Sequence, residues 1–153
     1  MAINDTNNIS KKLLKVFWFS LALPLLLFLA VAITLQLGIR YNPPGNIRIW
    51  GILLLVLSVT FGVALPVLFR TFFHGKYIKH KSVSISEYLV YQRGLITVCS
   101  IAIISASISY LFIVSTLYMY GSILAALYGV YSAIPFNERI VKELKIYKLE
   151  KPE

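Results

Sequence analysis

The side chains best suited to chemistry are two histidines and a glutamate, which lie between long apolar stretches of the sequence. His74, His80 and Glu87 follow one another at the spacing His-x5-His-x6-Glu, shortly after Arg70. Such groups bind metals or transfer protons where they converge. This spacing does not place all three on one helical face, and it matches no common zinc pattern. We therefore expect no metal, no cofactor and no catalytic site, and we expect the histidines to contact headgroups or solvent.

Cysteine chemistry is equally restricted. The chain contains a single cysteine, Cys99. This excludes an intrachain disulfide, a CxxC redox pair and a cysteine-based zinc site. A lone cysteine within an apolar segment is typical of a small buried hydrophobic residue, so we expect Cys99 to be structural.

The elements that carry these residues follow from the distribution of charge. The chain has 153 residues, of which 58% are apolar and 14% are charged, whereas about a quarter are charged in soluble domains. Three stretches of 24, 21 and 44 residues contain no charge: 16–39, 49–69 and 94–137. The first two are each long enough for one bilayer-spanning helix, and the third suits two. The sequence predicts an all-α integral membrane protein, a bundle of four transmembrane helices at about 16–39, 49–69, 94–115 and 119–136.

Basic residues predict the orientation of these spans, because Lys and Arg near span ends are retained in the cytoplasm. Thirteen of the fifteen basic residues precede the first span, lie between the second and third, or follow the fourth. Only Arg40 and Arg48 lie between the first and second. Both termini should therefore face the cytoplasm, with 70–93 as a cytoplasmic loop, in a bacterial inner membrane. The net charge of +9 is then a topology signal, and no nucleic-acid-binding motif accompanies it.

The N-terminal segment has a second interpretation, a cleaved signal peptide. Lys11, Lys12 and Lys15 precede an apolar core, and Ala30-Val31-Ala32 resembles a cleavage site. Cleavage there would leave three spans. The apolar run continues to Ile39 and is longer than a usual signal core, which favours a membrane span. The first ten residues are polar, and we expect them to be disordered.

Small residues line one face of each of the last two predicted spans. The candidate packing residues are Ala102, Ser105, Ala106 and Ser109 in the third span and Gly121, Ala125, Gly129 and Ala133 in the fourth. Helices in lipid adhere through such residues, because their backbones can approach closely. We expect the two faces to meet in a tight hairpin, with Ser105 near Gly129 and Ala102 near Ala133. Alternatively, one of the two faces makes a homodimer while the other packs within the chain.

Local signals predict kinks and helix ends. Pro24 and Pro66 lie within the first two spans, where a missing backbone donor kinks a helix. Ser84 and Glu87 have the spacing of a capping box, in which each side chain bonds the other's backbone N–H. A helix should therefore start near Ser84 and continue into the third span.

The chain divides into a four-span membrane domain, 1–137, and an amphipathic cytoplasmic tail, 138–153. Asn137 is a candidate N-cap for the tail. After it, apolar residues recur at helical spacing: Ile140, Val141, Leu144 and Tyr147. The pattern predicts an amphipathic helix on the inner membrane surface. It would anchor the chain or, alternatively, dock a soluble partner.

Cytoplasmic cations are candidates for contact with anionic headgroups or a partner protein. They are Arg70, Lys76, Lys79, Lys81, Arg93, Arg139, Lys142 and Lys145. Each cation contributes about 1 kcal/mol near an anionic membrane surface.

The predicted spans contain no Asp, Glu, Lys, Arg or His, although transporters and proton relays usually place such residues there. We therefore expect a protein that acts without catalysis, as a membrane subunit, assembly factor or immunity-type protein. Its partners would be membrane lipids and either further copies of itself or another membrane protein. The alternative is a small oligomeric transporter or pore for a neutral or anionic solute, lined by hydroxyls such as those of Ser100 and Ser107.

Overall fold

A computed structural model describes residues 3–39, 41, 45–79, 84–112 and 115–146. Within these ranges the chain is helical and contains no strand. The elements in chain order are α1 (Ile3–Gln36), α2 (Ile47–Val59), the π-helical turn η1 (Thr60–Ala64), α3 (Leu65–Lys79), α4 (Ile85–Leu111), α5 (Thr116–Ala133) and α6 (Asn137–Ile146).

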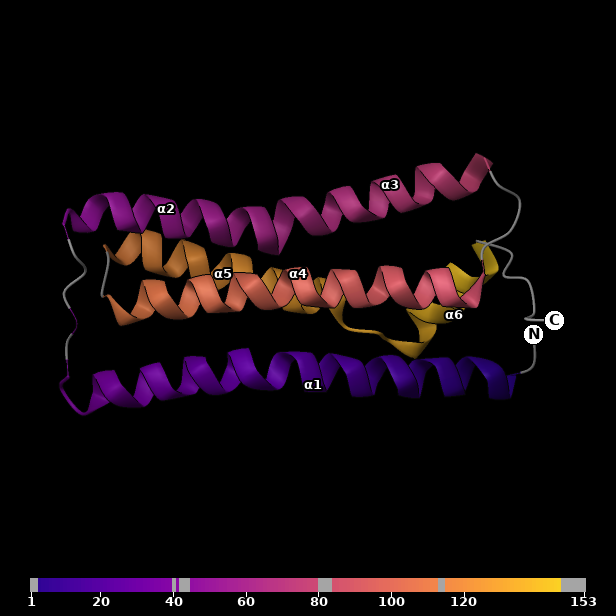
Figure 1. Ribbon diagram of the computed structural model, residues 1–153, viewed down its shortest axis with the longest axis horizontal. Helices are drawn as coiled ribbons and strands as arrows, with labels where there is room; N and C mark the ends of the chain where they lie inside the picture. Colours follow the sequence, from indigo (N-terminus) through magenta and orange to yellow (C-terminus); the bar gives the residue numbers. More distant parts are fainter. Residues whose placement is uncertain (1–2, 40, 42–44, 80–83, 113–114, 147–153) are drawn as a thin grey trace.

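Helix α4 lies at the centre of the arrangement and contacts α1, α2, η1, α3 and α5 (Figure 1). Helices α1 and α4 run in the same direction, whereas α2, η1 and α3 form one long rod that runs in the opposite direction. In the most apolar part of α4, 56% of the residues are buried, whereas 22% are buried in the corresponding parts of α1 and of the α2–α3 rod. The outer helices therefore turn most of their apolar surface away from the protein.

Three helical segments are long and apolar enough to cross a membrane: Ile9–Gln36, Ile47–Lys76 and Ile85–Leu111. Helices α5 and α6 pass the same test only together, as a pair bent by 65°. Large apolar side chains such as Phe19 and Leu23 are 85% and 75% exposed, and exposed apolar surface of this extent is rare on soluble monomers. The chain thus has three to four candidate spans, consistent with a multi-pass membrane protein.

Several helices extend beyond the predicted spans. Helix α1 begins at Ile3, so the expectation of a disordered start is wrong from that residue onward. Helix α3 continues to Lys79 and α4 begins at Ile85, so helix covers most of the segment predicted as a loop. The connection between α4 and α5 lies between Leu111 and Thr116, a few residues before the predicted turn.

The two prolines have different effects. Helix α1 continues through Pro24. Before Pro66 the rod widens into the π-helical turn η1, in which the Leu65 N–H donates to the Thr60 carbonyl oxygen five residues earlier. A proline cannot donate, and its ring crowds the carbonyl of the fourth residue before it, here Gly62. The wider turn allows the rod to accommodate Pro66, and it places Gly62 against α5.

The two predicted caps differ from the observed helix starts. Ser84 is the N-cap of α4, but its side chain makes no capping hydrogen bond. Its hydroxyl instead lies 2.8 Å from that of Ser86, so the predicted capping box is wrong. At the start of α6, the Ile140 N–H donates to the Phe136 carbonyl oxygen over 2.9 Å. The first helical bond therefore starts one residue before the predicted cap, Asn137.

Candidate functional site

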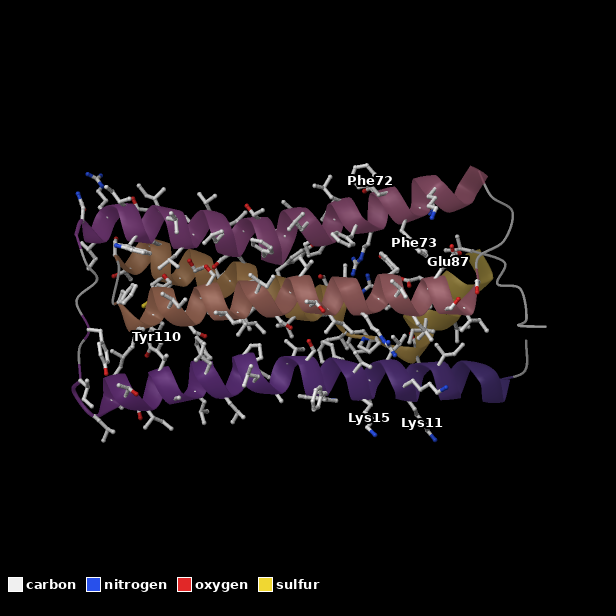
Figure 2. The ribbon with its side chains drawn as sticks, in the orientation of Figure 1. Lys11, Lys15, Phe72, Phe73, Glu87 and Tyr110 are labelled. Atoms are coloured by element: carbon white, nitrogen blue, oxygen red, sulfur yellow. The ribbon has the colours of Figure 1, made fainter. Side chains whose placement is uncertain are left out.

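Most of the cations that the structure describes lie at one end of the molecule, which we call the basic end. Helices α1 and α4 begin there, α3 ends there and α6 lies there (Figure 1). Its described cations are Lys11, Lys12, Lys15, Arg70, Lys76, Arg93, Arg139 and Lys142. Figure 2 shows Lys11 and Lys15 pointing away from the helices. At the opposite end the described cation is Arg48.

The predicted headgroup residues divide into two groups. Lys76, Arg93 and Lys142 are exposed. Arg70 and Arg139 are half-buried and make hydrogen bonds inside the protein. The side chains of Lys79 and Lys145 and the whole of Lys81 fall outside the described residues. Among the predicted headgroup residues whose side chains are described, Lys76, Arg93 and Lys142 are therefore the ones at the protein surface.

A carboxylate on α6 joins that helix to α4. The Glu143 Oε2 atom accepts hydrogen bonds from the Tyr88 hydroxyl over 2.7 Å and from Gln92 Nε2 over 3.0 Å. Its other oxygen, Oε1, accepts from Arg139 Nε over 3.1 Å. Tyr88 is completely buried and Gln92 nearly so. Because buried polar groups are costly without partners, these bonds fix α6 against α4.

Two arginines converge on the end of α5. Arg70 from α3 and Arg139 Nη1 from α6 both donate to the Ser132 carbonyl oxygen, the second over 2.7 Å. The last carbonyls of a helix lack partners within it and carry partial negative charge. The guanidinium groups therefore satisfy the end of α5 while joining it to α3 and α6. We call the group Arg70, Tyr88, Gln92, Ser132, Arg139 and Glu143 the end network.

Apolar contacts hold α6 in the same place. Ile140 is almost completely buried in a cluster with Ile9, Leu13 and Tyr88. Ile140 therefore contacts α1 and α4. Its position on the apolar face of an amphipathic helix had predicted contact with lipid instead. Val141 is half-buried, and the side chains of Leu144 and Tyr147 are outside the described residues.

The end network borders a cavity of about 500 Å³. Its charged lining residues are Arg70, Arg139, Lys142, Glu138 and Glu143. Three cations face two carboxylates, so the walls carry a net positive charge.

The predicted packing residues lie in the interior around η1. The buried ones are Ala102, Ser105, Ala106, Ser109, Ala125, Gly129 and Ala133, and Gly121 is half-buried. A Cβ atom on Gly129 would lie 3.0 Å from the Gly62 Cα, and one on Gly121 would lie 2.7 Å from Leu55 Cδ1. Ser105 donates to the Leu54 carbonyl oxygen over 3.0 Å. Helices α4 and α5 pack together. The small residues also allow the α2–η1 segment to pack closely against both helices, which the sequence analysis did not predict.

Hydroxyl groups in the apolar helices bond mainly to their own backbones. Ser100, Ser107 and Ser122 each donate to the carbonyl oxygen four residues earlier. Ser100 also lies 3.2 Å from the Ser20 hydroxyl, between α4 and α1. These contacts are those of helix packing.

The structure describes only some of the residues that the sequence analysis considered for chemistry. The described part of the chain holds no group of three or more His, Cys, Asp or Glu side chains able to bind a metal. Cys99 is buried. His74 and Glu87 are both exposed, on α3 and α4, and His80 lies outside the described ranges.

Sequence reasoning missed Tyr88, Gln92, Ser132 and Glu143 as site residues. Tyr88 and Gln92 are four residues apart, as are Arg139 and Glu143, which places each pair on one helical face. This spacing indicates a polar face on each helix, but it does not indicate that the two faces meet.

No protein-family model, curated protein or solved structure matches this chain.

Proposed function

We propose that the chain is a small membrane protein that spans the bacterial cytoplasmic membrane four times, with both termini inside. It acts without catalysis, as a membrane subunit, assembly factor or immunity-type protein. Its basic end contacts anionic headgroups, and its helices contact one another and a membrane partner, which is either a second copy or a different protein.

The single observation that carries this proposal is the separation of charge from the apolar helices. The described cations other than Arg48 lie at the basic end, and Arg70 and Arg139 of that group belong to the end network. Ser100, Ser107 and Ser122 of the apolar helices bond to their own backbones. Charge at one end serves adhesion to a membrane surface, whereas a transport pathway usually needs charge inside the spans.

Lipid selectivity tests the headgroup contact. We would purify the full chain, add phosphatidylglycerol or phosphatidylcholine, and measure bound lipid by native mass spectrometry. Replacing Arg93 and Lys142 with glutamine should weaken the phosphatidylglycerol preference about fivefold for each cation removed. The matched control, Arg40→Gln with Arg48→Gln, removes two cations from between the first two spans and should leave the preference unchanged.

The competing function, transport, has its own measurement. Liposomes that contain the protein should retain small neutral and anionic solutes as well as empty liposomes do. Solute flux that requires the protein and is abolished by Gly129→Leu would contradict the proposal. An equal loss of lipid preference in both double variants would contradict the headgroup role alone.

A further inference from the structure

A second cavity, of about 660 Å³, lies between α3 and α4 at the basic end. It is lined by Phe69, Phe72, Phe73 and Lys76 from α3, with Ser86, Glu87, Val90, Tyr91 and Gly94 from α4. On α3 the lining residues follow the spacing i, i+3, i+4, i+7, and Glu87, Val90, Tyr91 and Gly94 repeat it on α4. Each helix therefore presents one continuous face to the cavity. We call this cavity the aromatic groove.

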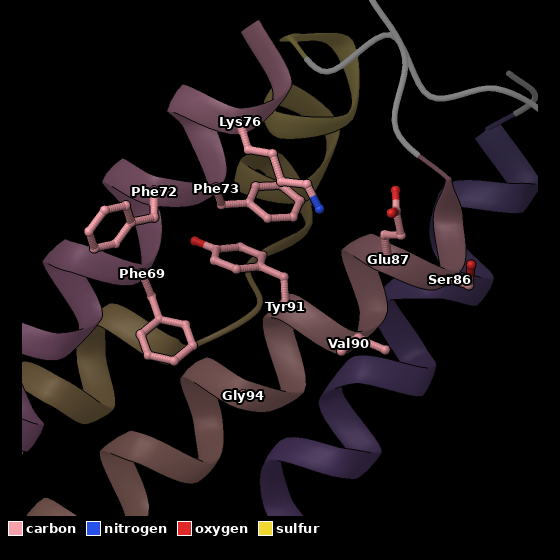
Figure 3. Close-up of a pocket in the computed structure, with 9 residues that line it drawn as sticks. All are labelled: Phe69, Phe72, Phe73, Lys76, Ser86, Glu87, Val90, Tyr91 and Gly94. Carbon is pink, nitrogen blue, oxygen red and sulfur yellow. The ribbon is translucent and has the colours of Figure 1, made fainter. Parts of the chain in front are cut away.

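The groove has a charged end and an apolar end (Figure 3). Lys76 and Glu87 lie at the end nearest the start of α4, and Phe69 and Gly94 lie at the opposite end. Seven residues of helix separate these ends, which corresponds to about 10 Å. The uncharged stretches of the sequence end at Phe69 and begin again at Gly94, so the apolar end of the groove lies at their boundary and the charged end lies beyond it.

Aromatic packing forms the wall between the two ends. The rings of Phe73 and Tyr91 stack, with their centroids 4.0 Å apart and an angle of 17° between their planes. The groove is open on its outer side, because Phe72 is 73% exposed and Val90 is 68% exposed. At Gly94, the absence of a side chain leaves space beside Phe69, whose Cε1 atom lies 3.5 Å from the position of a Cβ. The groove is thus open along the side of the helices that would face lipid.

We propose that the aromatic groove binds one phospholipid with a phosphoethanolamine headgroup, an inference that rests on the proposed membrane function. The first part of an acyl chain lies along Phe69, Phe72 and Val90. The phosphate lies at Lys76 and the ammonium group at Glu87. Charge complementarity selects this headgroup, since one cation and one carboxylate match a zwitterion. Phosphatidylglycerol could place its phosphate at Lys76 in the same way, but its uncharged glycerol headgroup has no cation to pair with the Glu87 carboxylate. A choline headgroup has no N–H to donate to it.

Native mass spectrometry of the full chain, titrated with lipids of identical acyl chains, tests this inference. At the groove, the site that Val90→Trp would fill, phosphatidylethanolamine should bind with a Kd at least about fivefold lower than that of phosphatidylcholine or phosphatidylglycerol. Val90→Trp should fill the groove and raise that Kd about tenfold. Val56→Trp, at an exposed position on α2, adds the same bulk away from the groove and should leave the Kd unchanged.

A charge swap tests the headgroup contacts separately from the fit of the acyl chain. Lys76→Glu should abolish the preference for phosphatidylethanolamine. Lys76→Glu combined with Glu87→Lys should restore it, because a zwitterion can reverse its orientation. Restored binding would also show that the single variant lost the lipid through charge rather than through unfolding.

Three outcomes would overturn the inference. They are a phosphatidylethanolamine Kd unaffected by Val90→Trp, a groove that prefers phosphatidylglycerol, and a dimer of the chain that Val90→Trp dissociates. The proposed function would survive each of these, because its own test uses Arg93 and Lys142, which do not line the groove.

Discussion

Glu143 shows how one side chain determines the position of a whole helix. It belongs to α6, yet its carboxylate accepts hydrogen bonds from Tyr88 and Gln92 of α4. Arg139, one turn earlier on α6, bonds both that carboxylate and the Ser132 carbonyl. A carboxylate with three donors is well compensated, whereas the donors would be costly without it. The energetic weight of the end network therefore lies in the donors that Glu143 keeps satisfied.

Replacing Glu143 with alanine should lower the free energy of unfolding by about 1–3 kcal/mol, because the buried Tyr88 hydroxyl loses its acceptor and Gln92 Nε2 keeps only the Tyr88 oxygen. Unfolding in mixed detergent micelles, followed by circular dichroism, measures this loss. The matched control is Glu138→Ala, which removes an exposed carboxylate from the same helix and should cost less than about 1 kcal/mol. Equal losses in the two variants would show that the end network contributes nothing specific.

At the scale of elements, the tightest contact is the crossing of η1 with α5. A Cβ atom on Gly62 would lie 2.3 Å from the Ala125 carbonyl oxygen and 3.4 Å from the Ala102 Cβ. Neither backbone can retreat without separating the helices. The proline that follows and the glycine at the crossing thus act together, since the π-helical turn before Pro66 places Gly62 against α5.

Gly62→Ala should therefore destabilise the protein by about 1–3 kcal/mol, because the added methyl group overpacks the crossing. Gly75 provides a matched control in the same rod, where an added Cβ would meet nothing within 4 Å. Gly75→Ala should raise stability by up to about 1 kcal/mol, since alanine favours a helix interior. The same unfolding assay separates the two. A stabilising Gly62→Ala would mean that η1 and α5 do not touch as described.

The apolar helices could be predicted from the sequence because lipid sets a simple rule. A span needs about 20 uncharged residues, and the stretches that begin at Val16 and Ile49 satisfy it. The extension of α1 back to Ile3 could not be predicted in this way. The polar residues at the start of α1 predict a free terminus, but Ile9 and Leu13 are buried against Tyr88 and Ile140. Packing between segments distant in sequence decides such helices.

The site was predictable only in part, for a related reason. Charge counting located the basic end, but it placed Arg70 and Arg139 on the membrane surface together with Lys142. Helical periodicity shows which residues share a face and not what covers that face. Glu143 on the tail therefore reads as solvated, although it accepts its hydrogen bonds from α4.

The whole molecule combines an exposed apolar surface with a charged end. Helix α4 is enclosed by its neighbours, and the outer helices expose large apolar side chains along their length. Such a surface is stable in lipid and costly in water. The start of α1 and all of α6 lie at the basic end (Figure 1), so a membrane across the helices would leave both on one side.

Accessibility labelling of single cysteines, in a Cys99→Ala background, tests this arrangement most directly. Lys11→Cys and Glu138→Cys lie at the basic end, and Asn46→Cys lies before α2 at the opposite end. In intact cells a membrane-impermeant thiol reagent should label position 46 alone, and all three positions should react after permeabilisation. Labelling of positions 11 and 138 from opposite sides of the membrane, or of position 46 from the same side as both, would contradict the account.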